Sequence, residues 1–298
     1  MPQKKYVLIT AARNEEKYIE ETLKSVTAQT ILPQHWVIVS DGSVDRTEEI
    51  VSAYKEKCSF INLICLDSKR ERDFAAKVSA IEIGYKSIAS YGFDFIGILD
   101  ADISVEPSYY EQILQEFERN PKLGVAGGEA YNLIGNKFAR VTSVLHHVPG
   151  PVQMFQRACF DAVGGFPPLR FGGEDTAAEV MVRMKGWVTE SFRGIPVYHH
   201  RQTGTATGGI LQARFREGRM DYYLGYHPLF AVAKALARLL RKPYLIGSLV
   251  SMIAYILEWL RGGKIQLPDD YISFLHKEQM QRIKLLLRLA RKKITRPS

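Results

Sequence analysis

With 298 residues, of which 46% are hydrophobic and 24% charged, the chain can bury a sizeable core, and these values exclude wholesale disorder. Its three cysteines (Cys58, Cys65 and Cys159) include no CxxC pair, which argues against a disulfide framework or a structural zinc site and favours a reducing compartment. The net charge of +8 is uneven: residues 201–298 carry 18 Lys and Arg against 6 Asp and Glu, a net of +12, whereas the preceding residues have a net of −4.

The front half alternates strand-like and helix-like segments. Continuous apolar runs predict strands at residues 6–11, 36–40, 62–66 and 95–99. Amphipathic stretches predict helices at residues 15–28, 45–57, 74–91 and 108–119. Buried strands separated by helices are typical of an α/β doubly wound fold, with a mostly parallel sheet covered by helices on both faces.

From residue 124 to residue 192 the pattern loosens. Short strands are predicted at 124–130, 154–157 and 188–192, and a helix at 174–185 ends at Gly186, a plausible C-cap. We interpret this stretch as the second half of one domain spanning residues 1–200, whose loops build a pocket.

Residues 201–298 form a helical, basic C-terminal region. A helix is predicted at 229–241, and residues 244–257 contain no charge. A membrane-spanning helix needs about 20 apolar residues, so this segment is expected to be buried or interfacial, although a span becomes conceivable if it extends to residue 260.

The last residues predict an amphipathic helix of the membrane-surface type. Its apolar stripe consists of Ile283, Leu286, Leu287, Ala290 and Ile294. The basic residues on the opposite side are Arg282, Lys284, Arg288, Arg291 and Lys292. The equally weighted alternative is that this helix docks on the first domain with its cations solvated.

The basic region requires an anionic partner. Lipid headgroups are favoured over nucleic acid, because the chain has no nucleic-acid-binding signature and its basic residues lie among aliphatic side chains. The first residues also lack the pattern of a secretory signal. We therefore expect a peripheral protein on the cytoplasmic, inner face of a cell membrane.

Ligands of open α/β sheets bind outside the carboxyl ends of the strands, so the residues that follow each strand are informative. Asp100-Ala101-Asp102 follows the fourth strand, and two carboxylates spaced by one residue can point the same way. Their oxygens suit Mg²⁺ or Mn²⁺, which can bridge the phosphates of a nucleotide diphosphate. The alternative is a polar turn.

Asp41 follows the second strand, beside Ala11, Arg13 and Glu15 of the first strand-to-helix loop. A carboxylate there can accept hydrogen bonds from a base N–H or a ribose hydroxyl, so these four residues are candidates for donor binding. Asp45, by contrast, is interpreted as a helix cap.

Gly172-Gly173-Glu174-Asp175 opens a predicted helix. Acidic residues there stabilise the positive end of the helix dipole, which is one interpretation. The functional interpretation makes Asp175, with Glu174 beside it, a general base aimed into the pocket by the glycine-rich turn.

His199, His200 and Arg201 follow the last apolar strand of the first domain. A single histidine is usually structural, and we expect one of these two to be so. Together with Arg201 they could also supply a metal ligand and a clamp for phosphate.

Four segments, in this order and spacing, resemble the family 2 glycosyltransferases of the GT-A fold. They are ITAARNEEKYIEETLKSVTAQT, VIVSDGSVDRT, ILDADISVEP and CFDAVGGFPPLRFGGEDTAAEVMVRMKGW. The resemblance covers about residues 6–201 and implies a nucleotide-sugar donor, a divalent metal and inversion at the anomeric carbon. The segments HHRQTGTA and RFREGRMDY are similar to those of bacterial members that build surface polysaccharides.

Carried over residue by residue, the resemblance makes Asp41 the base- or ribose-binding residue and Asp175 the catalytic base of the acidic pair. Asp100 and Asp102 become the nucleotide-diphosphate and metal aspartates. Two departures weaken individual contacts. Ser40 stands where the family often has a second acid, and Lys77, a candidate for the donor phosphate, is followed by Val78 and Ser79 rather than by Asn.

The expected activity is sugar transfer to a hydroxyl of a glycan or lipid-linked acceptor. Two alternatives remain open. A sugar-phosphate nucleotidyltransferase is disfavoured because no glycine follows the first strand to grip a triphosphate. A non-catalytic membrane-associated scaffold of the same fold is disfavoured because Asp102 and Asp175 are both present.

Overall fold

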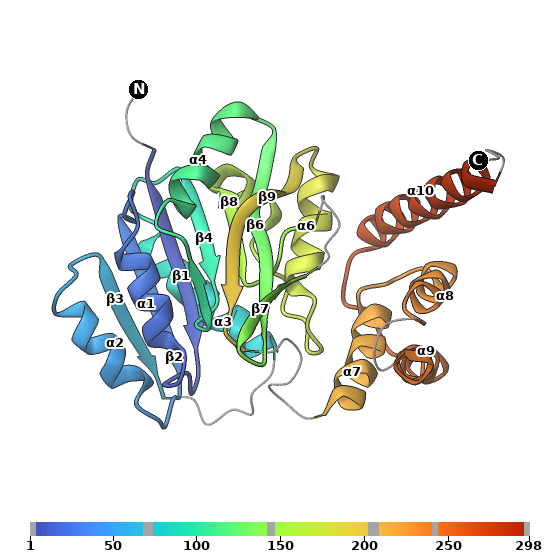
Figure 1. Cartoon of the computed structure of the whole chain (residues 1–298), viewed down its shortest axis with the longest axis horizontal. Helices are drawn as coiled ribbons and strands as arrows, with labels where there is room; N and C mark the ends of the chain where they lie inside the picture. The colour runs from blue at the N-terminus through green and yellow to red at the C-terminus, as the bar shows by residue number, and fades with distance from the viewer. Residues whose placement is uncertain (1–3, 68–73, 142–146, 202–208, 240–243, 295–298) are drawn as a thin grey trace. The chain divides into compact units, whose positions relative to one another are not determined.

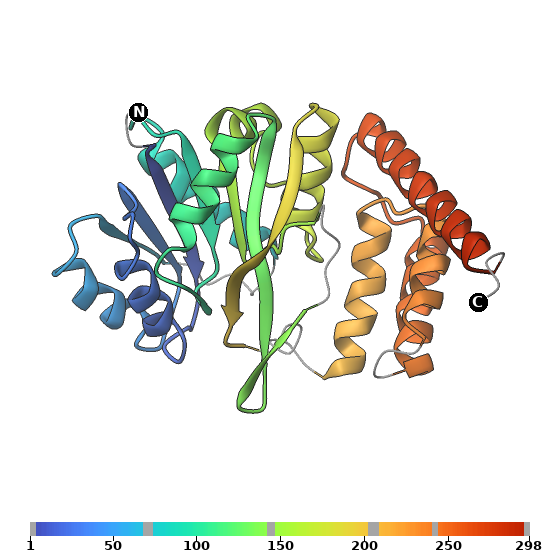
Figure 2. The same cartoon turned by 45° about the horizontal axis from the view of Figure 1, so that its top comes forward.

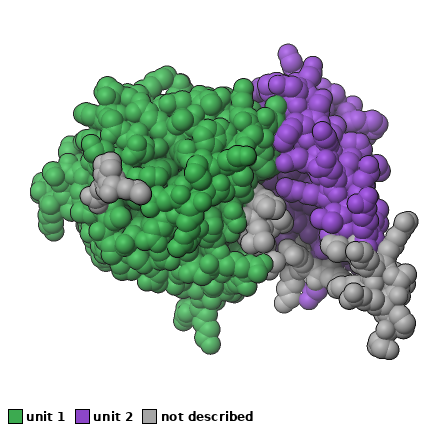
Figure 3. All heavy atoms as spheres, turned by 90° about the horizontal axis from the view of Figure 1, so that it is seen from above, with its two compact units in different colours: residues 1–170, 174–203 green, residues 171–173, 204–298 purple. Residues whose placement is uncertain are grey.

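The computed structural model describes residues 4–67, 74–141, 147–201, 209–239 and 244–294 (Figure 1); of Phe74 and of residues 289–294 it describes the backbone alone. Helices and strands alternate through the first two thirds of the chain, and helices alone follow (Figure 2). The chain divides into two compact units, coloured separately in Figure 3: Met1–Arg170 with Glu174–Thr203, and Phe171–Gly173 with Gly204–Ser298.

The first unit contains all the strands of the described chain and six helices. The strands are β1 (Tyr6–Ala12), β2 (His35–Asp41), β3 (Ile61–Leu66), β4 (Phe95–Leu99), β5 (Ile103–Val105), β6 (Leu123–Ile134), β7 (Lys137–Arg140), β8 (Val152–Gln156) and β9 (Val188–His199). The helices are α1 (Ile19–Thr27), α2 (Thr47–Lys55), α3 (Phe74–Ile88), α4 (Tyr109–Arg119), α5 (Arg157–Val163) and α6 (Glu174–Met184).

All the strands join one mixed sheet, in the order β3-β2-β1-β4-β8-β6-β9-β5, with β7 paired to β6. The first four strands of this order are parallel. Beyond β4 the pairing alternates: β8 is antiparallel to β4 and β6, β9 is parallel to β6, and β5 is antiparallel to β9. The predicted α/β fold class is confirmed, and its parallel pairing is concentrated in the first four strands.

Helices cover both faces of the sheet because successive strand side chains point to opposite faces. Tyr6 and Leu8 of β1 join a core cluster with residues of α1, α2 and α4. Val7 and Ile9 of the same strand join a second cluster with residues of α3, α5 and α6. Trp36, fully buried, donates from its indole nitrogen to the Thr10 hydroxyl at 3.0 Å, so the one polar atom of this ring is satisfied.

The second half of the sheet differs from the prediction in detail. Strands β6 and β9 are longer than expected, and their pairing is irregular between Gly128 and Glu129. The two backbones approach closely there, because a Cβ atom on Gly128 would lie 2.2 Å from the carbonyl oxygen of Ile195. Helix α1 begins later than residue 15, since residues 15–18 form turns. Gly186 has a φ of 85°, which fits its predicted place after α6.

The second unit is helical. Its helices are α7 (Ile210–Tyr223), α8 (Pro228–Ala237), α9 (Tyr244–Leu260) and α10 (Asp269–Ile294). Both helices predicted at 229–241 and 244–257 are present, although residues 240–243 lie outside the described residues. The side chains of Ala290 and Ile294 from the predicted apolar stripe, and of Arg291 and Lys292 from the basic face opposite it, also lie outside them. Within the described chain, every helix is too short or too polar to cross a membrane.

Candidate active site

The ends of β1 and β2 form one wall of the candidate site. The two strands are parallel, with Ala11 opposite Val39, so both chains leave the sheet at the same edge. Arg13 then lies beside Asp41, with Nη1 3.5 Å from Oδ2. The predicted neighbourhood of Asp41 and Arg13 is therefore confirmed.

The two loops that follow β1 and β2 are tied together by short polar contacts. Asn14 adopts a left-handed φ of 56°, and its side-chain oxygen accepts the Val44 N–H at 2.9 Å. The Thr47 hydroxyl accepts the Glu15 N–H at 2.7 Å. Asp45 accepts the N–H groups of Thr47 and Glu16, but α2 begins at Thr47 with Arg46 as its N-cap, so Asp45 lies one residue before the cap position predicted for it. Burial opposes the charge of Asp45, but the hydrogen bonds from Thr47 and Glu16 lower its pKa.

The two aspartates that follow β4 have different partners. Asp100 lies 2.7 Å from the Lys77 ammonium of α3. Asp102 instead faces His199 and Arg201. The expectation that both carboxylates point the same way assumed an extended strand, but residues 101 and 102 form a turn between β4 and β5. Each carboxylate is thus directed to a separate cation.

Asp102 is the centre of the first cluster. His199 Nε2 lies 3.2 Å and Arg201 Nε 3.3 Å from Asp102 Oδ2, and Arg201 also pairs with the buried Glu15. Burial alone would raise the pKa of Asp102, but the hydrogen bond and charge of His199, followed by the charges of Arg201 and Lys77, lower it. Asp102 is therefore a carboxylate near neutral pH.

His199, rather than His200, faces Asp102. Strand β5 pairs with β9 so that Ile103 lies opposite His199. The His200 ring lies 2.8 Å from the Ser104 hydroxyl, and burial lowers its pKa. His200 therefore has the structural role expected for one of the two histidines, through its contact with Ser104. His199 lies beside the Asp102 carboxylate and is the better placed candidate for a metal ligand.

Lys77 is the centre of the second cluster. Its ammonium lies 2.7 Å from Asp100 and 3.7 Å from Glu174 at the start of α6. Burial opposes the charge on Lys77, but the carboxylates of Asp100, Glu174 and Asp175 outweigh it and raise the pKa of this lysine. Because Lys77 also acts on the pKa of Asp102, the two clusters share one electrostatic environment.

Glu174 and Asp175 lie in different surroundings although they are adjacent. Glu174 is 4% exposed, and its Oε2 atom is buried with no hydrogen-bond partner among the described residues. The pKa of Glu174 is raised to about 7, mainly by burial. The charge of Lys77 opposes this rise, and the charge of Asp175 adds to it. Asp175 is only partly buried, and its Oδ1 accepts the Thr176 N–H at 2.7 Å.

Three glycines lie close to Asp175. Gly172 and Gly173 have φ values of 90° and 88°, which L side chains rarely adopt, so the turn before α6 requires glycine. A Cβ atom on Gly150 would lie 2.0 Å from Asp175 Oδ2. The Asp175 carboxylate therefore packs against the bare backbone of residue 150.

The pair His147–Glu179 was not anticipated from the sequence. His147 Nδ1 lies 3.2 Å from Glu179, a buried carboxylate that also accepts the Val148 N–H and the Gln153 amide. Burial lowers the pKa of His147, but Glu179 and then Asp175 more than compensate and raise it. His147 follows no strand end and belongs to no motif, so only the tertiary structure shows that it lies within the electrostatic reach of Asp175.

Asp102 and His199 are the residues that fit a divalent metal. No group of three or more His, Cys, Asp or Glu side chains poised to hold a metal occurs in the parts of the chain described here. Asp102 Oδ2 and His199 Nε2 are nevertheless 3.2 Å apart, close to the separation of about 3 Å for neighbouring ligands of an octahedral ion. Mg²⁺ is often held by one or two protein ligands together with substrate phosphates, so this pair fits such a metal.

Comparisons with known proteins identify the family of this chain. Residues 7–172 match the family model described as "Glycosyl transferase family 2". A stretch of 120 residues is 34% identical to the poly-beta-1,6-N-acetyl-D-glucosamine synthase of Staphylococcus aureus (strain COL), and 31% identical to that of Staphylococcus epidermidis. Each match covers 40% of this chain and 27% of the relative, so the chain spans only about a quarter of their length.

Two solved structures share the fold at low sequence identity. The mannosyltransferase PcManGT from Pyrobaculum calidifontis, in complex with GDP-Man and Mn2+, has a TM-score of 0.57 at 16% identity, covering 94% of this chain and 85% of that one. S. aureus TarS 1-349 in complex with UDP-GlcNAc has a TM-score of 0.55 at 15% identity, covering 91% and 78%.

Proposed function

Because this chain belongs to glycosyltransferase family 2, we propose that it transfers a sugar from a nucleotide-diphosphate donor to a hydroxyl group of a glycan or lipid-linked acceptor, with inversion at the anomeric carbon. The observation that carries the proposal is the gathering of Asp102, His199, Arg201 and Lys77 where β4 and β9 end. Carboxylate, imidazole and two cations in one electrostatic environment suit a diphosphate and the metal that accompanies it.

The donor nucleotide is assigned to the wall formed by β1 and β2. The side chain of Asp41 is 13% exposed, and its carboxylate can accept a hydrogen bond from a ribose hydroxyl or a base N–H. Ala11, half-buried on β1 opposite Val39, and Arg13 flank it. Glu15 acts indirectly, since its carboxylate holds Arg201.

The diphosphate is assigned to the two cations. Arg201 and Lys77 are each held in place by carboxylates, so they are already oriented before a ligand binds. A divalent cation, Mn²⁺ or Mg²⁺, would be held by Asp102 and His199, and when bound it neutralises charge on the leaving diphosphate. Lys77 and Arg201 stabilise the same charge through direct contacts.

Asp175 is the proposed general base. It takes the proton from the acceptor hydroxyl, whose oxygen forms a bond to the anomeric carbon while the bond to the diphosphate oxygen breaks on the opposite face. The transition state has the oxocarbenium character seen in glycoside hydrolysis. Glu174 is too buried to meet an acceptor, and its proposed role is to hold Lys77 toward the donor.

The similarity to polysaccharide synthases supports a surface polysaccharide as the product. The first donors to test are UDP-GlcNAc and GDP-Man, the ligands named for the two structural neighbours. The purified chain is incubated with each donor, with Mn²⁺, with Mg²⁺ or with a chelator, and nucleoside diphosphate release is followed by chromatography.

Slow release of nucleoside diphosphate that requires the metal supports sugar transfer. The coupling constant of the anomeric proton in the product then shows whether the configuration is inverted or retained. Pyrophosphate release from a nucleoside triphosphate and a sugar phosphate would instead identify a nucleotidyltransferase. If no donor in a wide panel yields nucleoside diphosphate or pyrophosphate, and calorimetry detects no donor binding, the protein would be a non-catalytic scaffold.

A further inference from the structure

Helix α9 reverses the usual distribution of polar and apolar side chains. In a soluble protein an amphipathic helix buries its apolar face and exposes its polar one. The buried residues of α9 include Ser248, Tyr255 and Glu258, whereas its exposed side chains are large and apolar. The most exposed are Leu245 at 65%, Leu249 at 61%, Trp259 at 61% and Leu260 at 68%.

The inward face of α9 packs along helix α7. A Cβ atom on Gly218 of α7 would lie 1.9 Å from the carbonyl oxygen of Ser251, so the two backbones nearly touch at the middle of α9. Towards the end of α9, Glu258 pairs with Arg219 of α7 at 2.8 Å and accepts the Tyr223 hydroxyl at 2.9 Å. Contacts spread over this length hold α9 in one orientation, with the opposite face outward.

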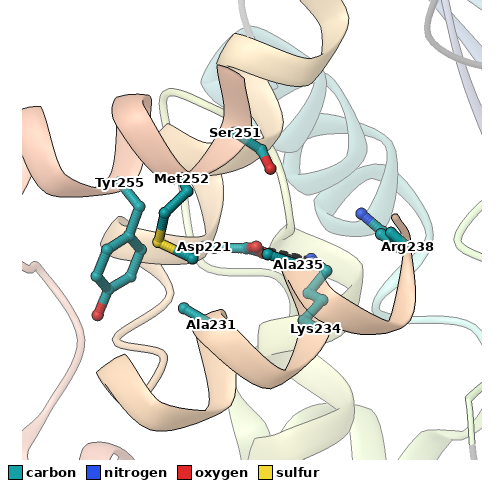
Figure 4. Close-up of a pocket in the computed structure, with 8 residues that line it drawn as sticks. All are labelled: Asp221, Ala231, Lys234, Ala235, Arg238, Ser251, Met252 and Tyr255. Carbon is teal, nitrogen blue, oxygen red and sulfur yellow. Dashed lines mark hydrogen bonds and ion pairs between the residues drawn. The ribbon is translucent and has the colours of Figure 1, made fainter. Parts of the chain in front are cut away.

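The interior between α7, α8 and α9 is correspondingly polar (Figure 4). Both oxygens of Asp221 accept from the Lys234 ammonium at 2.7 Å, and Lys234 lies 3.2 Å from Glu217. Arg238 also pairs with Glu217. Burial opposes the charge on Glu217, but Lys234 and Arg238 outweigh it and lower its pKa to about 2. This small unit thus has a cluster of paired charges between its helices.

Helices α8 and α10 of the same unit also expose large apolar side chains. Leu229, Val232 and Leu236 of α8 are exposed at spacings of three and four residues, which places them on one face. In α10, Leu285, Leu286 and Leu287 are exposed beside the exposed cations Arg282, Lys284 and Arg288. Scattered apolar residues on a surface are normal, but one helix face made almost wholly of them marks an interaction site.

We infer that the outer face of α9, together with the exposed stripe of α8, rests in the headgroup and upper acyl region of an anionic lipid bilayer. The aromatic side chains of Tyr244 and Trp259, near the two ends of α9, suit such an interface. The described part of α10 supplies cations that attract anionic headgroups.

Charge favours a lipid surface over a second copy of the chain. Residues 201–298 carry a net of +12, so two copies that met through this region would repel each other. An anionic bilayer attracts the same region and accepts apolar side chains without needing a shape that matches them.

The test is co-sedimentation of the full chain with vesicles of phosphatidylcholine alone, or with 30% phosphatidylglycerol. The test variant carries Leu249→Glu and Ile256→Glu, two substitutions seven residues apart on the outer face of α9. The matched control carries Val44→Glu and Ile134→Glu, which replace two exposed apolar residues of the first unit and change the net charge equally. Circular dichroism and hydrogen exchange verify that both variants fold.

We expect the wild type and the control to bind vesicles that contain phosphatidylglycerol. The α9 variant should bind about 100-fold more weakly, from the loss of two apolar side chains at the interface. Equal binding by the α9 variant and the control would overturn the inference, as would failure of the wild type to bind. A folded α9 variant that turns a dimer into a monomer without changing vesicle binding would make this face an interface between copies instead.

Trp259 supplies a second measurement that needs neither donor nor acceptor. The chain contains three tryptophans, of which Trp36 is fully buried, so a Trp187→Phe variant leaves Trp259 as the exposed reporter. Its emission should shift to shorter wavelength when phosphatidylglycerol vesicles are added, and quenchers placed in the acyl chains should reduce it. An unchanged emission at saturating lipid would contradict the proposed orientation of α9.

Discussion

The two units distribute apolar and charged side chains differently. In the first unit, apolar side chains pack on both faces of the sheet, and the buried charges lie near the ends of strands. In the second unit, the buried charges lie between helices, and large apolar side chains face outward. Two lysines illustrate the difference. Lys77 lies between Asp100 and Glu174 in the first unit, and Lys234 lies between Asp221 and Glu217 in the second. Burial opposes the charge of each lysine, but the carboxylates raise both pKa values.

The two clusters differ in how completely their hydrogen bonds are satisfied. Both oxygens of Asp221 accept hydrogen bonds from Lys234, so neither is left without a partner. We call such a fully hydrogen-bonded cluster closed. Glu174 keeps a buried Oε2 atom with no hydrogen-bond partner among the described residues, and the Asp100 side chain is 25% exposed. A closed cluster positions helices, whereas an incompletely satisfied one has capacity for a ligand. Substitutions in the first unit should therefore change activity, and those in the second should change stability.

The largest expected effect is that of Asp175→Asn. Removal of a general base typically costs about 10²–10⁴-fold in rate, so turnover should fall by that factor while donor affinity and the melting temperature stay the same. Turnover is measured by steady-state kinetics with the donor found to be active, and donor affinity is measured separately by calorimetry. Turnover equal to that of the wild type would remove Asp175 from this role.

Asp221→Ala should have the next largest effect, on the stability of the second unit. Among the described residues it leaves the Lys234 ammonium with Glu217 as its carboxylate partner, and breaking a buried pair costs about 3–5 kcal/mol. Hydrogen exchange should therefore accelerate by about two to four orders of magnitude in peptides of α7, α8 and α9, with little change in β1 to β4.

Asp100→Ala is the matched control, because it removes the corresponding partner of Lys77 in the first unit. The more exposed position of Asp100 lets water replace it, so exchange in α3 and β4 should change little. If both substitutions destabilise their units equally, the contrast between a closed and an open cluster is wrong.

The first unit was largely predictable because its strands are buried on both faces. Strands β1, β2 and β4 need uninterrupted apolar runs, and such runs mark their bounds to within one or two residues. Strand β5, with three residues, is too short to show a periodicity, and β7 is mostly exposed. The turns at residues 15–18 gave no signal that separates them from the first turn of α1.

Contacts within the site were predictable only where parallel strands determine them. The end of β2 meets the end of β1, so Asp41 could be placed beside Arg13. The choice of His199 over His200 depends on the register of β5 against β9, which the sequence does not reveal.

Other features depend on packing between segments far apart in the chain. His147 meets Glu179 only because the start of β8 packs on α6, and nothing near His147 in the sequence marks it. The reversed polarity of the second unit was equally hidden, because an apolar stripe predicts a helix without saying which way that stripe faces.

Gly150→Ala tests how closely the first unit positions its proposed base. The added Cβ atom would lie 2.0 Å from Asp175 Oδ2 and 2.8 Å from its Cγ atom, so the carboxylate must move. A displacement of about 1 Å can cost roughly 10²-fold in turnover. Donor KM and the melting temperature should change little, because a short side chain can rotate away. A large loss of stability with normal turnover per folded molecule would show instead that residue 150 serves packing alone.

The smallest expected effect concerns Glu174, whose pKa burial raises from 4.5 to about 7. Native Glu174 therefore keeps a proton that the unfolded chain releases above pH 4.5, so its contribution to stability is lost as the pH rises to about 7 and stays constant above it. Glu174→Gln removes this dependence. The melting temperature of the variant relative to the wild type should rise between pH 5 and pH 8, by the equivalent of about 1–3 kcal/mol. Asp221→Asn, in the closed cluster, gives the contrast, since it should lower the melting temperature at both pH values. A difference between Glu174→Gln and the wild type that is the same at pH 5 and pH 8 would mean that Glu174 titrates normally and that its free oxygen meets water.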